Sequence, residues 1–174
     1  AIKAYEYILT KGTETEIYIP AKIELINAKY ELAITGKYDK PNIKALADQY
    51  QEILTTYGKI PQTLFALKKL AYLQAYYLND LKEAEATLEA GIKISGLPKS
   101  EVAQLKIELG DIYLLSKQPW EAILVYEQVS KQFEGQVIGS EARYRSAKLN
   151  FYVFSKITFS QTSPQTFLIS YPRS

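Results

Sequence analysis

One pattern of small and large apolar positions recurs along the chain at a constant offset of 38 residues. Its three positions follow one another as i, i+4 and i+7, so they lie on one face of a helix. A period of this length is typical of stacked supersecondary units rather than of a single globular core. The sets that carry the pattern are Leu46, Tyr50 and Ile53; Ala84, Leu88 and Gly91; and Ala122, Tyr126 and Val129.

A fourth copy of the pattern, at Ala1, Tyr5 and Ile8, lies 45 residues before the copy that starts at Leu46. The extra length coincides with the polar residues 10–16, which we interpret as a loop insertion because longer loops cost little entropy. This first copy lacks the partner helix that precedes each of the others. We therefore expect the chain to be a segment of a larger array that begins inside a helix pair.

A first helix is predicted before each later copy, and another follows the last copy. Helix ends are also predicted: Asp80 and Glu83 form an acidic capping box, and Pro119 fits the first turn of a helix. Ser100 and Ser140, each followed by a glutamate, are expected to be N-caps. The first helices are expected at residues 21–35, 60–78, 101–115 and 140–154. Equivalent positions in them are Ala33, Ala71, Leu109 and Ala147.

The clearest unit resembles the tetratricopeptide repeat (TPR). Leu109-Gly110-x-x-Tyr113, a short turn and then Ala122 with Tyr126 follow the TPR pattern. The resemblance covers residues 1–154 and implies an all-α fold, an α-solenoid of antiparallel helix pairs wound as a right-handed superhelix. It also implies that the first helices of the pairs line a concave surface.

The chain departs from the TPR pattern in three ways. Its period is longer than the usual value of about 34 residues, as in a longer-period bacterial TPR-like array. Lys106 stands where a large aromatic residue is usual, and Gly58 and Glu134 replace the proline that often closes a unit. No specific subfamily is therefore indicated, and a different kind of α-solenoid is the alternative.

Residues 155–174 contain no acidic residue and no helical periodicity. We expect them to form an irregular C-terminal tail after a repeat array at 1–154. In a second interpretation, residues 166–170 lie against the end of the array and cover an apolar face. A foreign sequence joined by a shifted reading frame is a third.

The composition narrows the classes of partner. The 174 residues are 47% hydrophobic and 23% charged, as in ordinary folded chains. Lysine and glutamate alternate and the net charge is +2, so we expect no nucleic-acid partner. No apolar run reaches the roughly 18 residues of a membrane span, so we expect no membrane insertion. The absence of cysteine selects neither the cytoplasm nor the periplasm, and the oligomeric state stays open.

The residues that usually carry catalysis and metal binding are missing. The chain has no histidine, cysteine or methionine, so it offers no imidazole base and no sulfur or imidazole ligand. Gly91 and Gly110 are expected to be points of close helix packing rather than parts of a phosphate loop. Carboxylate pairs such as Glu108 with Asp111 are expected to be solvated. We predict no catalytic residue, no cofactor and no metal.

Aromatic residues on the first helices give the main indication of binding. They provide contact area at low entropic cost, and lysine and aspartate side chains at the rim of a groove would orient a ligand. The alternative is that these tyrosines pack between helices. Trp120 is expected to pack over a repeat junction, or else to anchor a partner. The candidate groove residues are Tyr30, Lys69, Tyr72, Tyr76, Asp111, Lys148, Phe151 and Tyr152.

Two further features bear on anion binding. Arg143, Arg145 and Lys148 form a local basic cluster, but two of its members are two residues apart and cannot share a helix face. The carboxylate clamp by which some TPR domains hold acidic C-termini is not visible, because Ile107 and Asp111 stand at its positions. Binding of chaperone tails is therefore disfavoured.

The sequence favours a noncatalytic scaffold or adaptor that presents a concave groove to a peptide or protein segment. A regulatory solenoid that senses a small ligand or peptide is the first alternative. The second is a noncatalytic segment of a larger enzyme or of a cell-envelope assembly factor.

Overall fold

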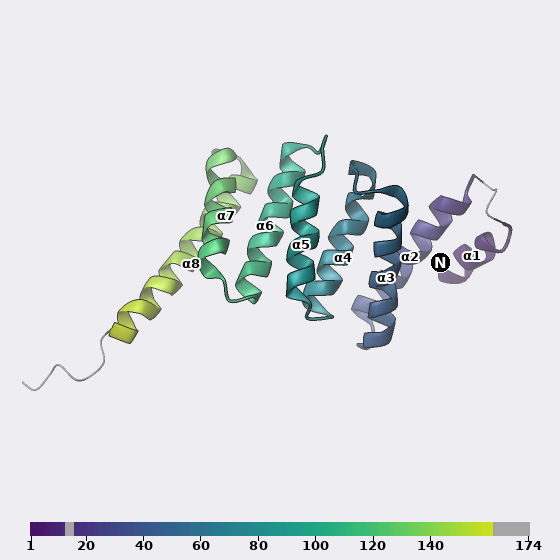
Figure 1. The fold of residues 1–174 in the computed structure, drawn as a ribbon, viewed down its shortest axis with the longest axis horizontal. Helices are drawn as coiled ribbons and strands as arrows, with labels where there is room; N and C mark the ends of the chain where they lie inside the picture. Colours follow the sequence, from purple (N-terminus) through teal and green to yellow (C-terminus); the bar gives the residue numbers. More distant parts are fainter. Residues whose placement is uncertain (13–15, 162–174) are drawn as a thin grey trace, which may run out of the picture. The chain divides into compact units, whose positions relative to one another are not determined.

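The computed structural model describes residues 1–12 and 16–161, and within these residues the chain is entirely helical, with no β-strand (Figure 1). The expected all-α fold with seven or eight helices is confirmed. The helices are α1 (Ile2–Leu9), α2 (Tyr18–Thr35), α3 (Lys40–Tyr57), η1 (Pro61–Thr63, a 3₁₀ turn), α4 (Leu64–Tyr76), α5 (Leu81–Ile92), α6 (Lys99–Leu115), α7 (Pro119–Gln132) and α8 (Val137–Gln161).

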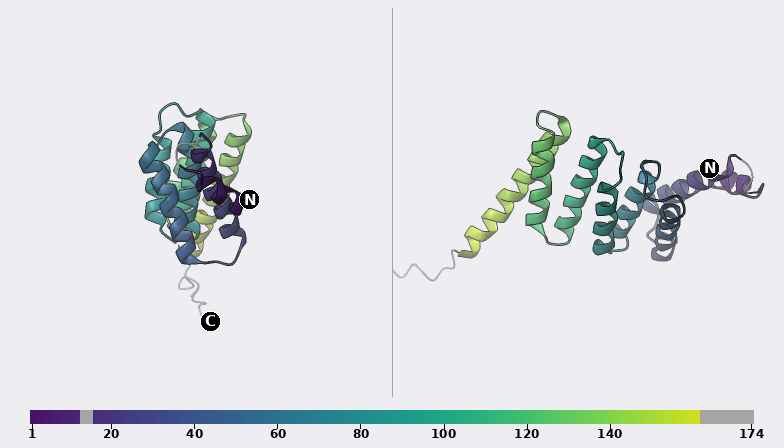
Figure 2. Two further views of the ribbon diagram at one scale, coloured as in Figure 1. Left: turned by 90° about the vertical axis from the view of Figure 1, so that its right-hand side faces the viewer. Right: turned by 45° about the horizontal axis from the view of Figure 1, so that its top comes forward.

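The helices pack in chain order within two compact units. The N-terminal unit comprises Ala1–Leu105, and the C-terminal unit begins at Lys106, inside α6. In the first unit, α1 packs on α2, α2 on α3, α3 on α4, and α4 on α5. In the second unit, α7 packs on α8, and the two helices lie side by side in Figures 1 and 2.

The residues of the three pattern copies that start at Leu46, Ala84 and Ala122 are buried, whereas those of the copy at Ala1 are not. The prediction that Ala84 and Ala122 are buried is confirmed, since both side chains are fully enclosed. The large members Tyr50, Leu88 and Tyr126 are removed from water almost completely, whereas Tyr5 of the first copy is only partly buried. Burial of one large apolar side chain stabilises the fold by about 1.5–3 kcal/mol. The fully buried members include Leu46, Tyr50, Leu88, Tyr126 and Val129.

Two glycines allow helices to approach unusually closely. A Cβ atom at Gly110 would lie 2.5 Å from Cε1 of Tyr126, and one at Gly91 would lie 2.8 Å from Cδ2 of Leu67. Both distances are too short for any side chain without a local shift. The prediction that these glycines are packing points is therefore confirmed.

The predicted helix starts are partly correct. The Glu83 amide donates to Oδ1 of Asp80 at 3.4 Å, and Pro119 is the first residue of α7. The predictions that Ser100 and Ser140 are N-caps are wrong, because α6 begins at Lys99 and α8 at Val137. The Ser140 amide donates to the carbonyl of Gln136, the residue before α8, so Ser140 lies in the first turn of the helix.

Two predicted boundaries shift as well. The helix expected at residues 60–78 is divided, because Thr63 ends a 3₁₀ turn and the α-helix runs from Leu64 to Tyr76. The hydroxyl of Thr63 donates to the carbonyl of Gly58 at 2.7 Å and accepts from the amide of Ile60 at 3.1 Å, which fixes this turn. Helix α8 continues to Gln161, into the segment expected to be irregular. The proposed contact of residues 166–170 lies outside the described residues.

Candidate functional site

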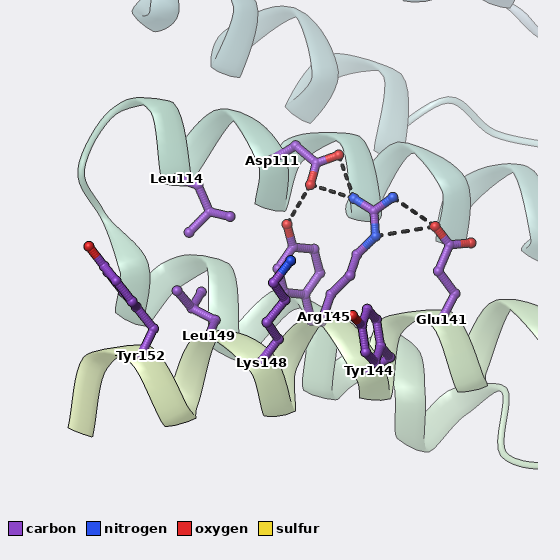
Figure 3. Close-up of a pocket in the computed structure, with 9 residues that line it drawn as sticks. Asp111, Leu114, Glu141, Tyr144, Arg145, Lys148, Leu149 and Tyr152 are labelled. Atoms are coloured by element: carbon purple, nitrogen blue, oxygen red, sulfur yellow. Dashed lines mark hydrogen bonds and ion pairs between the residues drawn. The ribbon is translucent and has the colours of Figure 1, made fainter. Parts of the chain in front are cut away.

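A pocket of about 510 Å³ opens in the C-terminal unit (Figure 3). Helices α6, α7 and α8 all contribute to its wall. Its size lies within the range of about 300–1,000 Å³ that is usual for ligand sites. The lining residues are Asp111, Leu114, Tyr126, Glu141, Tyr144, Arg145, Lys148, Leu149 and Tyr152.

The spacing of the lining residues explains how the helices form the wall. On α8, Glu141, Arg145, Lys148 and Tyr152 are separated by three or four residues, so they project from one side of the helix. Asp111 on α6 faces them across the pocket (Figure 3).

Tyr126 reaches the pocket from α7 because Gly110 leaves room for its ring against the backbone of α6. Its side chain is 1% exposed, so the ring belongs to the core and only its hydroxyl end takes part in polar contacts. That hydroxyl donates a hydrogen bond to Oδ1 of Asp111 at 2.6 Å. The contact between Gly110 and Tyr126 thus brings α7 next to Asp111 on α6.

Asp111, Arg145 and Glu141 form a continuous ionic network (Figure 3). Nη1 of Arg145 donates to both carboxylate oxygens of Asp111, at 2.5 and 2.7 Å. On the other side of the guanidinium, Nε and Nη2 donate to Oε1 of Glu141 at 3.2 and 2.7 Å. The single arginine therefore joins α6 to the first turns of α8.

The network shifts the pKa values of Tyr126 and Arg145. Burial raises the pKa of the Tyr126 phenol, and its hydrogen bond to Asp111 raises it further. Burial by itself lowers the pKa of the Arg145 guanidinium, but its hydrogen bonds to Asp111 and Glu141 outweigh burial, so the pKa is raised. Near neutral pH the tyrosine is neutral and the arginine is charged.

The interpretation of Asp111 as a solvated acid is wrong. Its carboxylate is about two-thirds buried and is occupied by Tyr126 and Arg145. The members of the expected basic cluster do not act together. Arg145 binds the carboxylates of the network, whereas Nη2 of Arg143 lies 3.7 Å from Oε1 of Glu134. The pair of Glu141 and Arg145 at i and i+4 is visible in the sequence, whereas the contact of Arg145 with Asp111 joins residues 34 apart and has no local signal.

The structure brings together three of the predicted groove residues in this pocket. Asp111, Lys148 and Tyr152 all line it, whereas Phe151 is not part of the wall and is 78% exposed. The remaining lining residues are not among the predicted groove residues, although Arg145 belongs to the predicted basic cluster and Tyr126 to the repeated pattern. Leu114, Leu149 and Tyr144 carry no polar signal that separates them from core positions, and the period alone does not distinguish the two faces of α8.

The other four candidates lie in the N-terminal unit. Tyr30 is only 7% exposed and packs edge-on against Tyr50, so it is a core residue rather than a groove residue. Nζ of Lys69 lies 3.6 Å from the centre of the Tyr30 ring and 3.2 Å from Oε1 of Glu31. The lysine thus covers Tyr30 while its own charge is matched.

A tyrosine cluster surrounds Tyr72 in the same unit. The rings of Tyr72 and Tyr76 have centres 4.7 Å apart, and the Tyr72 ring is 5.9 Å from that of Tyr77. The Tyr38 ring stacks on Tyr77, and its hydroxyl donates to the carbonyl of Tyr77 at 3.0 Å. Tyr38, Tyr72 and Tyr76 are 42–54% exposed, so this cluster is both packed and accessible.

Three further properties of the described residues concern Trp120, metal binding and membrane insertion. Trp120, the second residue of α7, is 52% exposed, so half of the indole is accessible. In residues 1–12 and 16–161, no three or more acidic side chains come together as a possible metal site. None of the described helices combines the length and hydropathy required to cross a lipid bilayer.

Comparison with known proteins does not assign the chain to a protein family. No protein-family model, no curated protein and no solved structure matches it. The site is therefore interpreted from its own geometry.

Proposed function

We propose that this chain is part of a TPR-like helical repeat scaffold and acts as a noncatalytic module that binds a protein or peptide segment. The recurrence at 38 residues and the packing of helices on their neighbours in chain order support a repeat architecture. The observation that carries the binding function is the pocket of about 510 Å³ on α6–α8.

The lining of the pocket supports binding rather than chemistry. Its carboxylates and its arginine are satisfied by one another, so their charges stabilise the helix arrangement. Around them lie large side chains that remain accessible: Tyr144 is 66% exposed, Tyr152 54% and Leu114 38%. Accessible aromatic residues beside a concave surface are typical of protein-binding sites.

The proposal is tested by site-specific photo-crosslinking in cells that naturally make the protein. A benzoylphenylalanine at Tyr144 would stand at the pocket wall, and one at Leu124 is the matched control. Leu124 is 58% exposed on α7 but does not line the pocket. We expect discrete crosslinked proteins from the Tyr144 position only. Equal crosslinking at both positions, or none at Tyr144, would contradict a partner-binding pocket.

A regulatory role with a small ligand is the second candidate, because the pocket volume also suits a small molecule. Thermal-shift screening against a metabolite library separates the two. A ligand present at about 100 times its Kd stabilises the folded state by about 2.7 kcal/mol. A compound that raises Tm in the natural chain but not in a Tyr144→Ala variant would favour the sensor over the scaffold.

A further inference from the structure

One charged residue of the pocket is left out of the ionic network. Lys148 makes no hydrogen bond or ion pair with any described residue. Each of the other charged groups of the wall has a direct ionic partner, since Arg145 binds both Asp111 and Glu141. The Lys148 ammonium is therefore the charge that a ligand can pair with at no cost to an existing contact.

The position of Lys148 divides the pocket into two chemically different parts. Leu114, Leu149 and Tyr152 gather on one side of it, and the Arg145 network lies on the other (Figure 3). Lys148 itself reaches from α8 toward α6 between them. A ligand that covers the pocket thus meets an apolar surface immediately beside an unpaired cation.

We propose that the pocket binds a segment of a partner protein in which an Asp or Glu side chain stands next to a large apolar residue. This inference rests on the proposed function. The carboxylate pairs with Lys148, and the apolar side chain inserts among Leu114, Leu149 and Tyr152. The row from Glu141 to Tyr152 extends about 16 Å along α8, which accommodates about five residues of extended chain.

Charge complementarity selects an acidic segment over a neutral or basic one. A neutral ligand would cover the Lys148 ammonium without pairing it, and burying an unpaired charge is costly. A basic ligand would repel it, and both carboxylates of the wall already face Arg145. The wall carries two carboxylates and two cations and so has no net charge, but an acidic side chain is the one that pairs the Lys148 ammonium directly.

A side-chain carboxylate fits this site better than a chain terminus. Terminal carboxylates are captured by groups of free backbone N–H donors. The residues of this wall lie inside α6, α7 and α8, where backbone N–H groups are bonded to the carbonyls of the preceding turn. The donor that the pocket offers is the lysine.

The test is an array of amidated nonapeptides probed with the full chain. The central residue is Glu, Gln or Lys, and its neighbours are Phe, Leu or Ser in all combinations, between Gly-Ser flanks. We expect retention of peptides with Glu beside Phe or Leu, and not of the Gln, Lys or Ser versions. The best peptide is then measured by fluorescence anisotropy, with a free-carboxylate Gln version as a probe for terminal recognition.

Variants of the protein complete the test. Lys148→Gln is expected to weaken the Glu peptide about tenfold or more, the loss of one charge-assisted hydrogen bond. Lys148→Glu is expected to transfer the preference to the Lys peptide. Lys131→Gln, which removes an exposed lysine of α7 outside the pocket wall, is the matched control and leaves affinity unchanged. Circular dichroism verifies that all variants are folded.

The outcomes separate this inference from the proposed function. Retained peptides that lack an acid, or that bind the Lys148→Gln variant equally well, would overturn the acidic-segment inference and leave a peptide-binding pocket. Binding of the free-carboxylate Gln peptide alone would overturn it in favour of a chain terminus. If no peptide is retained, the inference fails, and crosslinking at Tyr144 decides the function independently.

Discussion

At the scale of single residues, the contact between Gly110 and Tyr126 controls the packing of the C-terminal unit. A Cβ at Gly110 would lie 2.5–3.1 Å from three ring atoms of Tyr126. That ring is buried and held at its hydroxyl by Asp111. It cannot move aside without breaking the hydrogen bond that connects α7 to the ionic network.

We predict that Gly110→Ala destabilises the protein by about 1–3 kcal/mol, the usual range for overpacking. The sign is informative, because alanine at an open helix position stabilises by about 0.5–1 kcal/mol relative to glycine. The free energy of unfolding is measured by urea denaturation.

The control is the same substitution in a Tyr126→Ala background. With the ring removed, Gly110→Ala should revert to a small stabilisation. If alanine destabilises equally in both backgrounds, then the ring is not what the glycine accommodates.

Tyr50, a member of the repeated pattern, and Tyr76, a candidate groove residue, should respond differently to truncation. Tyr76 is 51% exposed, so we expect Tyr76→Ala to lower the free energy of unfolding by less than about 1 kcal/mol. Tyr50 is fully buried and donates to Asn27, so Tyr50→Ala should cost about 3–5 kcal/mol. Comparable losses of Tm in the two variants would place Tyr76 in the core.

These residues also show what sequence can and cannot reveal. Ala122 was predictable, because a small residue also stands at the equivalent Ala84, and Gly110 was predictable from the Leu109-Gly110-x-x-Tyr113 motif that resembles the TPR. Asp111 and Arg145 were not, because their contact depends on which faces of α6 and α8 turn toward each other. Periodicity identifies an apolar stripe but gives no polar partner across 34 residues.

At the scale of helices, the Asp111–Arg145–Glu141 network joins α6 to α8. The side chains of Asp111 and Arg145 are about one-third exposed, so their interaction is stronger than a surface ion pair and weaker than a fully buried one. It replaces apolar contact at this point of the helix pair.

We predict a coupling energy of about 1–2 kcal/mol between Asp111→Ala and Arg145→Ala in a double-mutant cycle. The losses of unfolding free energy in the two single variants should sum to more than the loss in the double variant, because each single variant leaves an unmatched charge. Lys22 and Glu52, an exposed ion pair in the N-terminal unit, serve as the reference cycle with a coupling below about 1 kcal/mol. Equal coupling in both cycles would show that burial adds nothing.

Helix boundaries were less predictable than helix existence. The predicted caps at Ser100 and Ser140 fail because α6 and α8 begin before them, at Lys99 and Val137. A serine followed by glutamate fits the first turn of a helix as well as its cap. A cap position and a first-turn position are distinguished only by which carbonyl the backbone amide donates to, and this depends on the turn that precedes the helix.

At the scale of the whole molecule, the repeat pattern predicted the all-helical fold and the pairing of neighbouring helices, since each amphipathic helix must bury its stripe. The partner was not predictable from it. A period identifies residues that are equivalent among units, whereas the pocket is formed by residues such as Lys148 and Leu114 that differ between them.

Buried tyrosines in both units predict alkaline sensitivity. Burial raises the pKa of the Tyr30, Tyr50 and Tyr126 phenols above the ordinary value for tyrosine of about 10. In the unfolded chain these phenols ionise near pH 10, so above that pH the unfolded state binds fewer protons than the folded state. Their contribution to stability is complete below pH 10 and decreases as the pH rises further.

We expect Tm to change little from burial of these phenols between pH 7 and 9 and to fall above pH 10, as measured by circular dichroism. Tyr30→Phe is the cleanest comparison, because the Tyr30 hydroxyl makes no hydrogen bond to a described residue. In the Tyr30→Phe variant, Tm should fall less steeply as the pH rises above 10. An unchanged slope would mean that other groups cause the alkaline loss.

The placement of the aromatic residues gives the protein two separate optical signals. Its one tryptophan, Trp120, belongs to the C-terminal unit, whereas the closely spaced rings of Tyr30, Tyr72, Tyr76 and Tyr77 belong to the N-terminal unit. Indole emission, excited selectively at the long-wavelength edge, reports the melting of one unit. Near-ultraviolet ellipticity of the tyrosines reports mainly the other. A single denaturant titration, read in both channels, therefore reveals whether the two units unfold together or in sequence.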